Sequence, residues 1–108
     1  MNMNHAPDQV TEQDIEELML TVIYLTSVRH RLVSGKKANK EVLGEAIESW
    51  KGYDFSFLDS LNDKGWTKDD RKSKSFQISE EGEIKAQELI KKFLGKTFVL
   101  DRVTESSI

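Results

Sequence analysis

The chain has 108 residues, no cysteine, and 16 basic against 19 acidic side chains, which give a formal net charge of −3. This length predicts a single domain with one hydrophobic core. Without cysteine, disulfides, thiolate metal ligands and cysteine nucleophiles are excluded. Because no apolar run approaches the ~20 residues of a membrane span and no signal peptide is visible, we expect a soluble, cytoplasmic protein.

The N-terminal third of the sequence predicts a polar lead followed by a long helix. Residues 1–10 are polar, and we expect them to be disordered. Thr11 precedes Asp14 by three positions, which is a capping-box arrangement. From there apolar residues recur at spacings of three and four, with acidic residues at the start and basic residues at the end. The pattern predicts a helix from about 12 to 31.

Two shorter helices are expected in the middle of the chain. Asn39 is a candidate N-cap for a helix that reaches about Ser49, although Gly44 weakens it by roughly 1 kcal/mol relative to alanine. Asp54 is a good N-cap for the next helix. We expect that helix to end at Gly65 in a left-handed conformation.

The pattern that follows indicates a β-hairpin and a fourth helix. Two strands are expected, from Trp66 to Lys68 and from Ser75 to Ile78, joined by a charged turn. Residue 79 is a serine that can cap a helix ending at Gly95, and residues 96–108 are expected to be a partly disordered extension. The predicted fold class is therefore mainly α with a small β-hairpin (α+β). It is a winged helix-turn-helix over residues 11–95, with about four helices and a two-stranded wing.

Several segments carry a resemblance to known proteins. They are IYLT at 23–26, WKGYDF at 50–55, LDSLNDKG at 58–65, KSKS at 72–75 and SEEG at 79–82. They resemble a group of short bacterial proteins that share a domain of unknown function, over about residues 14 to 94, with a longer stretch here around 34–47. More loosely, LDSLNDKGW, the charged turn and FQISEEG resemble the end of MarR and PadR regulators. The looser likeness implies a winged-helix fold, and a DNA-binding role only by analogy.

Nucleic acid would be contacted through the wing, if at all. The basic side chains of this hairpin are Lys68, Arg71, Lys72 and Lys74. A second basic group, which either solvates a loop or binds phosphate, consists of Arg29, Arg31, Lys36, Lys37 and Lys40. The helix before the wing, which would enter the major groove, presents Asp59 and Asp63 to a polyanion. The charge distribution therefore makes DNA binding the less favoured alternative.

No catalytic, metal-binding or cofactor-binding residues are predicted. The two histidines, His5 and His30, have no second ligand at a metal-binding spacing, and the serines have no evident general base. We interpret His30 as a surface residue at a helix end. A protein without enzymatic activity and without a cofactor is expected.

The favoured interpretation is a self-association or protein-interaction module, most simply a homodimer. The first predicted helix is apolar on more than half its circumference, and such a helix needs cover on two sides. One line, taken as the core side, consists of Ile15, Leu18, Met19 and Val22. Off this line lie Leu20, Ile23 and Tyr24, which are the candidate self-association residues. Their cover is either the same helix of a second copy or the apolar segment 98–100 of the same chain.

Overall fold

The computed structural model describes residues 8–35, 40–50, 55–69 and 74–107. In chain order, its elements are α1 (Glu12–Leu25), β1 (Val28–Ser34), β2 (Glu41–Trp50), α2 (Phe55–Asp63), β3 (Thr67–Asp69), β4 (Ser75–Ile78), α3 (Glu80–Leu94) and β5 (Val103–Ser107). The strands form one mixed sheet in the order β3-β4-β2-β1-β5. The predicted winged helix-turn-helix is therefore wrong. The described part of the chain is an α+β fold of three helices and a five-stranded sheet.

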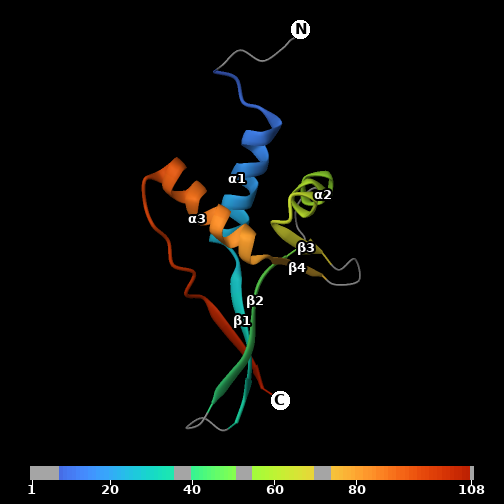
Figure 1. Ribbon diagram of the computed structural model, residues 1–108, viewed down its shortest axis with the longest axis vertical. Helices are drawn as coiled ribbons and strands as arrows, with labels where there is room; N and C mark the ends of the chain where they lie inside the picture. Colours follow the sequence, from blue (N-terminus) through green and yellow to red (C-terminus); the bar gives the residue numbers. More distant parts are fainter. Residues whose placement is uncertain (1–7, 36–39, 51–54, 70–73, 108) are drawn as a thin grey trace.

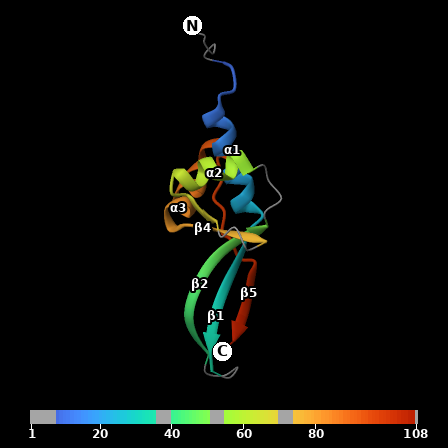
Figure 2. The same ribbon diagram turned by 90° about the vertical axis from the view of Figure 1, so that its right-hand side faces the viewer.

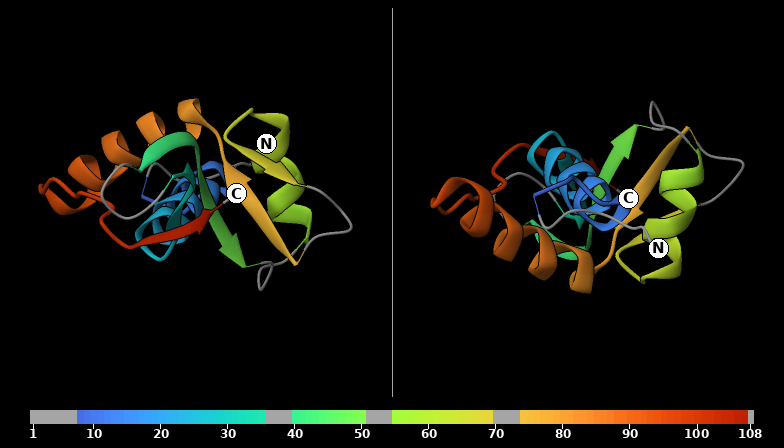
Figure 3. Two further views of the ribbon diagram at one scale, coloured as in Figure 1. Left: turned by 90° about the horizontal axis from the view of Figure 1, so that it is seen from below. Right: turned by 90° about the horizontal axis from the view of Figure 1, so that it is seen from above.

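The three helices gather at one end of the molecule, and three strands extend away from them (Figure 1, Figure 2). We call the extended part, made of β1, β5 and residues 41–46 of β2, the arm. Seen along the long axis, α1 lies between α2 and α3 (Figure 3). The core lies between the helices and the adjoining part of the sheet. Its buried members are Leu20, Ile23, Tyr24, Ile47, Leu58, Leu61, Phe76, Ile78, Ala86, Leu89, Ile90 and Leu100.

The start of α1 is as predicted, but its end is not. Thr11 accepts the backbone N–H of Asp14 at 3.1 Å, and the Asp14 carboxylate accepts the backbone N–H of Thr11 at 2.9 Å, so the capping box is confirmed. The helix ends at Leu25 rather than near 31. The hydroxyls of Thr26 and Ser27 donate to the backbone carbonyl oxygens four residues earlier, at 2.8 and 2.5 Å. These bonds give two carbonyl oxygens of the last helical turn a hydrogen-bond partner. The chain then extends into β1.

The second predicted helix, residues 39–49, is replaced by β2. Strand β2 pairs antiparallel with β1, from Val28 opposite Glu48 to Ser34 opposite Glu41, with a bulge at Leu32 and the residue after it. Short apolar runs fit a helix and a strand about equally well when judged by local pattern. Here the long-range pairing with β1 decides the outcome, and Gly44 already weakened the helical alternative.

The predicted hairpin and its flanking caps are confirmed locally. Strands β3 and β4 pair antiparallel, and Gly65 has a φ of +78°, as the turn from helix into strand requires. The Ser79 hydroxyl accepts the backbone N–H of Gly82 at 3.0 Å and caps α3, which ends at Gly95 with a φ of +67°. However, β4 also pairs with residues 47–50 of β2, so the hairpin is the edge of the sheet and not a free wing.

The C-terminal segment, expected to be partly disordered, contributes both to the core and to the sheet. Leu100 is buried, and the ring of Phe98 meets that of Tyr24 edge-on, with centroids 5.7 Å apart. Strand β5 then pairs parallel with β1, from Arg29 opposite Val103 onward. This strand therefore lies at the other edge of the sheet.

Candidate functional site

The two apolar faces of α1 have exchanged the roles that the sequence pattern assigned to them. Leu20, Ile23 and Tyr24, the predicted self-association residues, are 0% exposed and lie in the core of the same chain. By contrast, Leu18 and Val22 are 45% and 48% exposed. The expected contact surface of α1 is thus internal. Of the apolar line that was taken as core, Leu18 and Val22 face outward, whereas Met19 packs against the core.

The cover of the inner face comes from the same chain, which is one of the two alternatives left open by the sequence. Phe98 packs on Tyr24, and Leu100 belongs to the same core cluster. A helical periodicity identifies two apolar faces but does not say which one meets the core, because both obey the three-and-four spacing. For this reason the sequence pattern alone led to the wrong choice of buried face.

We call Ile15, Leu18 and Val22 the outer stripe of α1. Leu18 follows Ile15 by three residues and precedes Val22 by four, so the three side chains form a line along one helix face. Leu18 and Val22 are exposed, and Ile15 is half-buried. The outer stripe is therefore a continuous apolar surface on a rigid element.

The two ends of the outer stripe carry opposite charges. Glu12 is exposed in the first turn of α1, and Asp14 lies beside it. At the other end Arg102, from the C-terminal segment, donates through Nε to the backbone oxygen of Ser27 at 3.2 Å and through Nη2 to that of Leu25. Neither Glu12 nor Arg102 forms an ion pair with another described residue. The sequence did not indicate Arg102, because its position depends on the return of the chain to α1.

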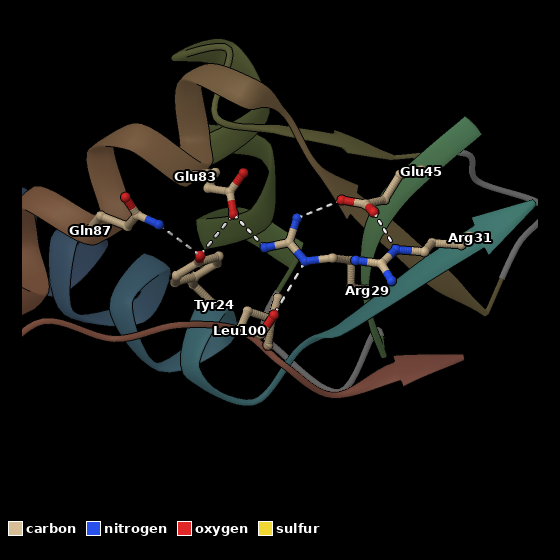
Figure 4. A network of polar contacts seen from close by, with 7 residues as sticks. All are labelled: Tyr24, Arg29, Arg31, Glu45, Glu83, Gln87 and Leu100. Atoms are coloured by element: carbon tan, nitrogen blue, oxygen red, sulfur yellow. Dashed lines mark hydrogen bonds and ion pairs between the residues drawn. The ribbon is translucent and has the colours of Figure 1, made fainter. Parts of the chain in front are cut away.

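A polar network centred on Arg29 joins the arm to the helices (Figure 4). The guanidinium of Arg29 donates to Glu45 on β2 at 2.7 Å, to Glu83 on α3 at 2.8 Å, and to the backbone oxygen of Leu100 at 3.2 Å. Glu45 also accepts from Arg31 at 2.6 Å. A partly buried guanidinium with three acceptors from three segments holds the arm at a fixed angle to the helices.

The charges of this network stabilise one another. Burial alone would lower the pKa of Arg29. The hydrogen bonds to Glu45 and Glu83 outweigh this effect and raise the pKa above its ordinary value. The hydrogen bonds from Arg31 and Arg29 lower the pKa of Glu45. Two of the basic side chains that were considered for phosphate binding are therefore already engaged by carboxylates. A third, Lys40, is bound by Glu105 at 2.7 Å.

His30 lies in β1 and not at a helix end. Its Nδ1 is 3.0 Å from the hydroxyl of Thr104 and 3.9 Å from a carboxylate oxygen of Glu48, and its Nε2 is 3.0 Å from the hydroxyl of Ser106. A serine, a histidine and an acid thus lie in the order of a catalytic triad. However, the histidine meets a threonine before it meets the acid, and Ser106 is exposed on an edge strand. The arrangement instead fastens β5 to β1.

The candidate nucleic-acid contacts are only partly visible. Lys68 and Lys74 are exposed on β3 and beside β4, whereas Arg71 and Lys72 lie outside the described residues. The helix before the hairpin, α2, exposes Asp59 and Asp63 as expected. The described part of the hairpin therefore presents two basic side chains, Lys68 and Lys74, and both were already indicated by the sequence.

The described part of the chain contains neither a metal cluster nor a membrane-spanning helix. Within residues 8–35, 40–50, 55–69 and 74–107, no group of three or more histidine, aspartate or glutamate side chains is placed to hold a metal ion. None of the helices in this part of the chain is long and apolar enough to cross a membrane.

Comparison with known families gives one match. A family model described as a domain of unknown function, DUF6429, covers residues 11–96. The chain belongs to the DUF6429 family. This confirms the expected resemblance to a domain of unknown function, while the looser likeness to MarR and PadR regulators loses its basis with the winged-helix fold. The DUF6429 chain matches no curated protein and no solved structure.

Proposed function

We propose that this DUF6429 domain is a non-enzymatic protein-interaction module that self-associates through the outer stripe of α1. The observation that carries the proposal is that α1 has two apolar faces and the fold covers one of them. Covering a half-exposed leucine or valine is worth roughly 1–2 kcal/mol, so two copies of the stripe together provide a useful driving force. Helix α1 is thus still proposed to mediate self-association, but through the face opposite to the one that the sequence pattern indicated.

Other apolar side chains are also exposed, and they define the competing surfaces. On α3 these include Ile84 and Leu94, and on the arm Val42 and Leu43. The outer stripe is favoured because its members stand one turn apart on a helix that is packed on both flanks, which presents them in fixed positions. Phosphate binding is less favoured because Arg29, Arg31 and Lys40 are engaged by carboxylates.

Sedimentation velocity at a series of concentrations tests the proposal. We expect the wild-type chain to dimerise in the micromolar range, and the double variant Leu18→Gln with Val22→Gln to remain a monomer. Glutamine is a good helix former, so the helix itself should persist, which circular dichroism checks. Ile84→Gln and Leu43→Gln, which remove apolar side chains at least as exposed elsewhere, should leave the dimer intact.

Three results would contradict the proposal. A wild-type chain that stays monomeric at high micromolar concentration removes self-association altogether. A dimer that is lost in Leu43→Gln but kept in the α1 double variant moves the contact to the arm. Salt-dependent binding of random duplex DNA with a slope of several released ions would support the nucleic-acid alternative instead.

A further inference from the structure

The two ends of the outer stripe differ in charge, and this difference constrains how a partner fits. Glu12 lies at the N-terminal end, where the Asp14 carboxylate adds a second negative charge. The pKa of Asp14 is lowered by its hydrogen bond from the Thr11 backbone, so this charge persists near neutral pH. Arg102 lies at the C-terminal end. With a rise of 1.5 Å per residue, the two ends of this 14-residue helix are about 21 Å apart.

We propose, resting on the self-association proposed above, that two copies pack their α1 helices antiparallel about a two-fold axis. Glu12 of each copy then meets Arg102 of the other. A surface that is apolar in the middle and oppositely charged at its ends is complementary to itself in this orientation and repels itself in the parallel one. An isologous dimer makes the same contact twice. A second copy of this chain is therefore the partner whose charges fit.

The antiparallel arrangement also fixes which apolar side chains meet. With the axis at the middle of α1, Leu18 of one copy lies near Leu18 of the other, and Ile15 lies near Val22 of the other. The positive N-terminal and negative C-terminal ends of the two helix dipoles are then adjacent, which adds a small favourable term. In a parallel pair Ile15 would instead meet Ile15 of the other copy, Val22 would meet Val22, and like ends of the two helix dipoles would be adjacent.

Charge reversal tests the pairing between copies. Glu12→Arg alone places two cations at each end of the dimer, and Arg102→Glu alone places anions there, so each variant should dimerise at least tenfold more weakly than wild type. An equimolar mixture of the two variants restores both pairs and should form a heterodimer close to wild-type affinity. Because Glu12 and Arg102 of one copy are a helix length apart, restoration in the mixture requires contact between copies.

Cysteine cross-linking tests the orientation without changing Arg102, whose hydrogen bonds also support the end of α1. The chain has no cysteine of its own, so Ile15→Cys and Val22→Cys each introduce a single thiol. In the antiparallel dimer, a mixture of the two variants should form a disulfide-linked heterodimer under mild oxidation. Each variant alone should not, since its two thiols lie about 10 Å apart along the axis.

The outcomes separate the two proposals. Cross-linking of each variant alone, without a cross-linked heterodimer in the mixture, would show a parallel dimer and overturn the antiparallel inference. A dimer by sedimentation with neither kind of cross-link and no rescue in the charge-reversed mixture would overturn the inference and leave self-association standing. A monomeric wild-type chain overturns both.

Discussion

The hydroxyl of Tyr24 donates a hydrogen bond of 2.8 Å to Oε2 of Glu83, and this bond ties the buried face of α1 to the first turn of α3. Arg29 donates to the same oxygen at 2.8 Å. Burial raises the pKa of Tyr24, so its hydroxyl remains a donor throughout the neutral range. One carboxylate oxygen thus joins two helices and the first strand.

Replacing Tyr24 by phenylalanine should destabilise the fold by about 1 kcal/mol. The ring and its contact with Phe98 remain, so the loss reports the hydroxyl alone. Urea unfolding measures the effect. Gln87→Ala is the matched control, because it removes an exposed donor 3.2 Å from the same hydroxyl and should change stability by no more than about 0.5 kcal/mol. Equal losses in the two variants would show that the bond to Glu83 contributes nothing of its own.

Replacing Gly82 by alanine should destabilise the fold by about 3 kcal/mol or more. A Cβ at this position would lie 2.8 Å from the carbonyl carbon of Trp66 and 2.9 Å from Cγ2 of Ile78, so the first turn of α3 would have to move off the hairpin. Gly44→Ala is the control, since a Cβ there has no heavy-atom neighbour within 4 Å. Thermal unfolding compares them, and a similar melting temperature for both variants would contradict the close packing at Gly82.

Replacing Gly65 by alanine should destabilise the fold by about 1 kcal/mol, and replacing it by asparagine by less. The residue has a φ of +78°, a left-handed conformation that alanine adopts with strain and asparagine tolerates better. Denaturant titrations of the two variants measure the difference. A loss for asparagine equal to or larger than that for alanine would point to a steric cause instead of a backbone one.

The hydrogen bonds of Glu45 should make stability depend on pH in the acid range. Since Arg31 and Arg29 lower the pKa of this carboxylate in the folded state, its contribution is complete above the ordinary glutamate pKa of about 4.3. It is lost as pH falls through the lowered folded value. After allowance for solvent screening, the contribution is at most about 1 kcal/mol.

Unfolding free energies at pH 7 and pH 3 check this dependence. Glu45→Gln should be less stable than wild type at pH 7, and the difference should be smaller at pH 3. The exposed carboxylate of Glu88 on α3 provides the control, because Glu88→Gln should follow the wild type at both pH values. A constant difference between wild type and Glu45→Gln at the two pH values would contradict the assignment.

The features that the sequence predicts correctly are those whose signals lie within a few residues of one another. The caps at Thr11 and Ser79, the left-handed Gly65 and the pairing of β3 with β4 all depend on local chemistry, and all are confirmed. The fold class failed because the sheet is assembled from distant segments. Residues 28–34 pair with 41–48 on one side, residues 29–33 pair with 103–107 on the other, and no local pattern specifies that choice.

The candidate site was half predictable for the same reason. The composition of α1 correctly indicated two apolar faces. Which face is internal depends on where the chain returns after α3, because the contacts of Phe98 and Leu100 cover Tyr24 and its neighbours. Arg102 reaches the end of α1 by the same return. The periodicity of the helix encodes neither the identity of its internal face nor the position of Arg102.

Strand β2 does not have the same neighbours along its whole length. Residues 47 and 48 pair with both β1 and β4, and residues 49 and 50 pair with β4, whereas residues 41–46 have only β1 beside them in the described part of the sheet. A single strand is therefore divided between two cooperative units of different opening free energy. Amide hydrogen exchange should register this as a step between Ala46 and Ile47, with the slowly exchanging side buried among the helices. The arm can then open locally while the rest of the molecule remains folded.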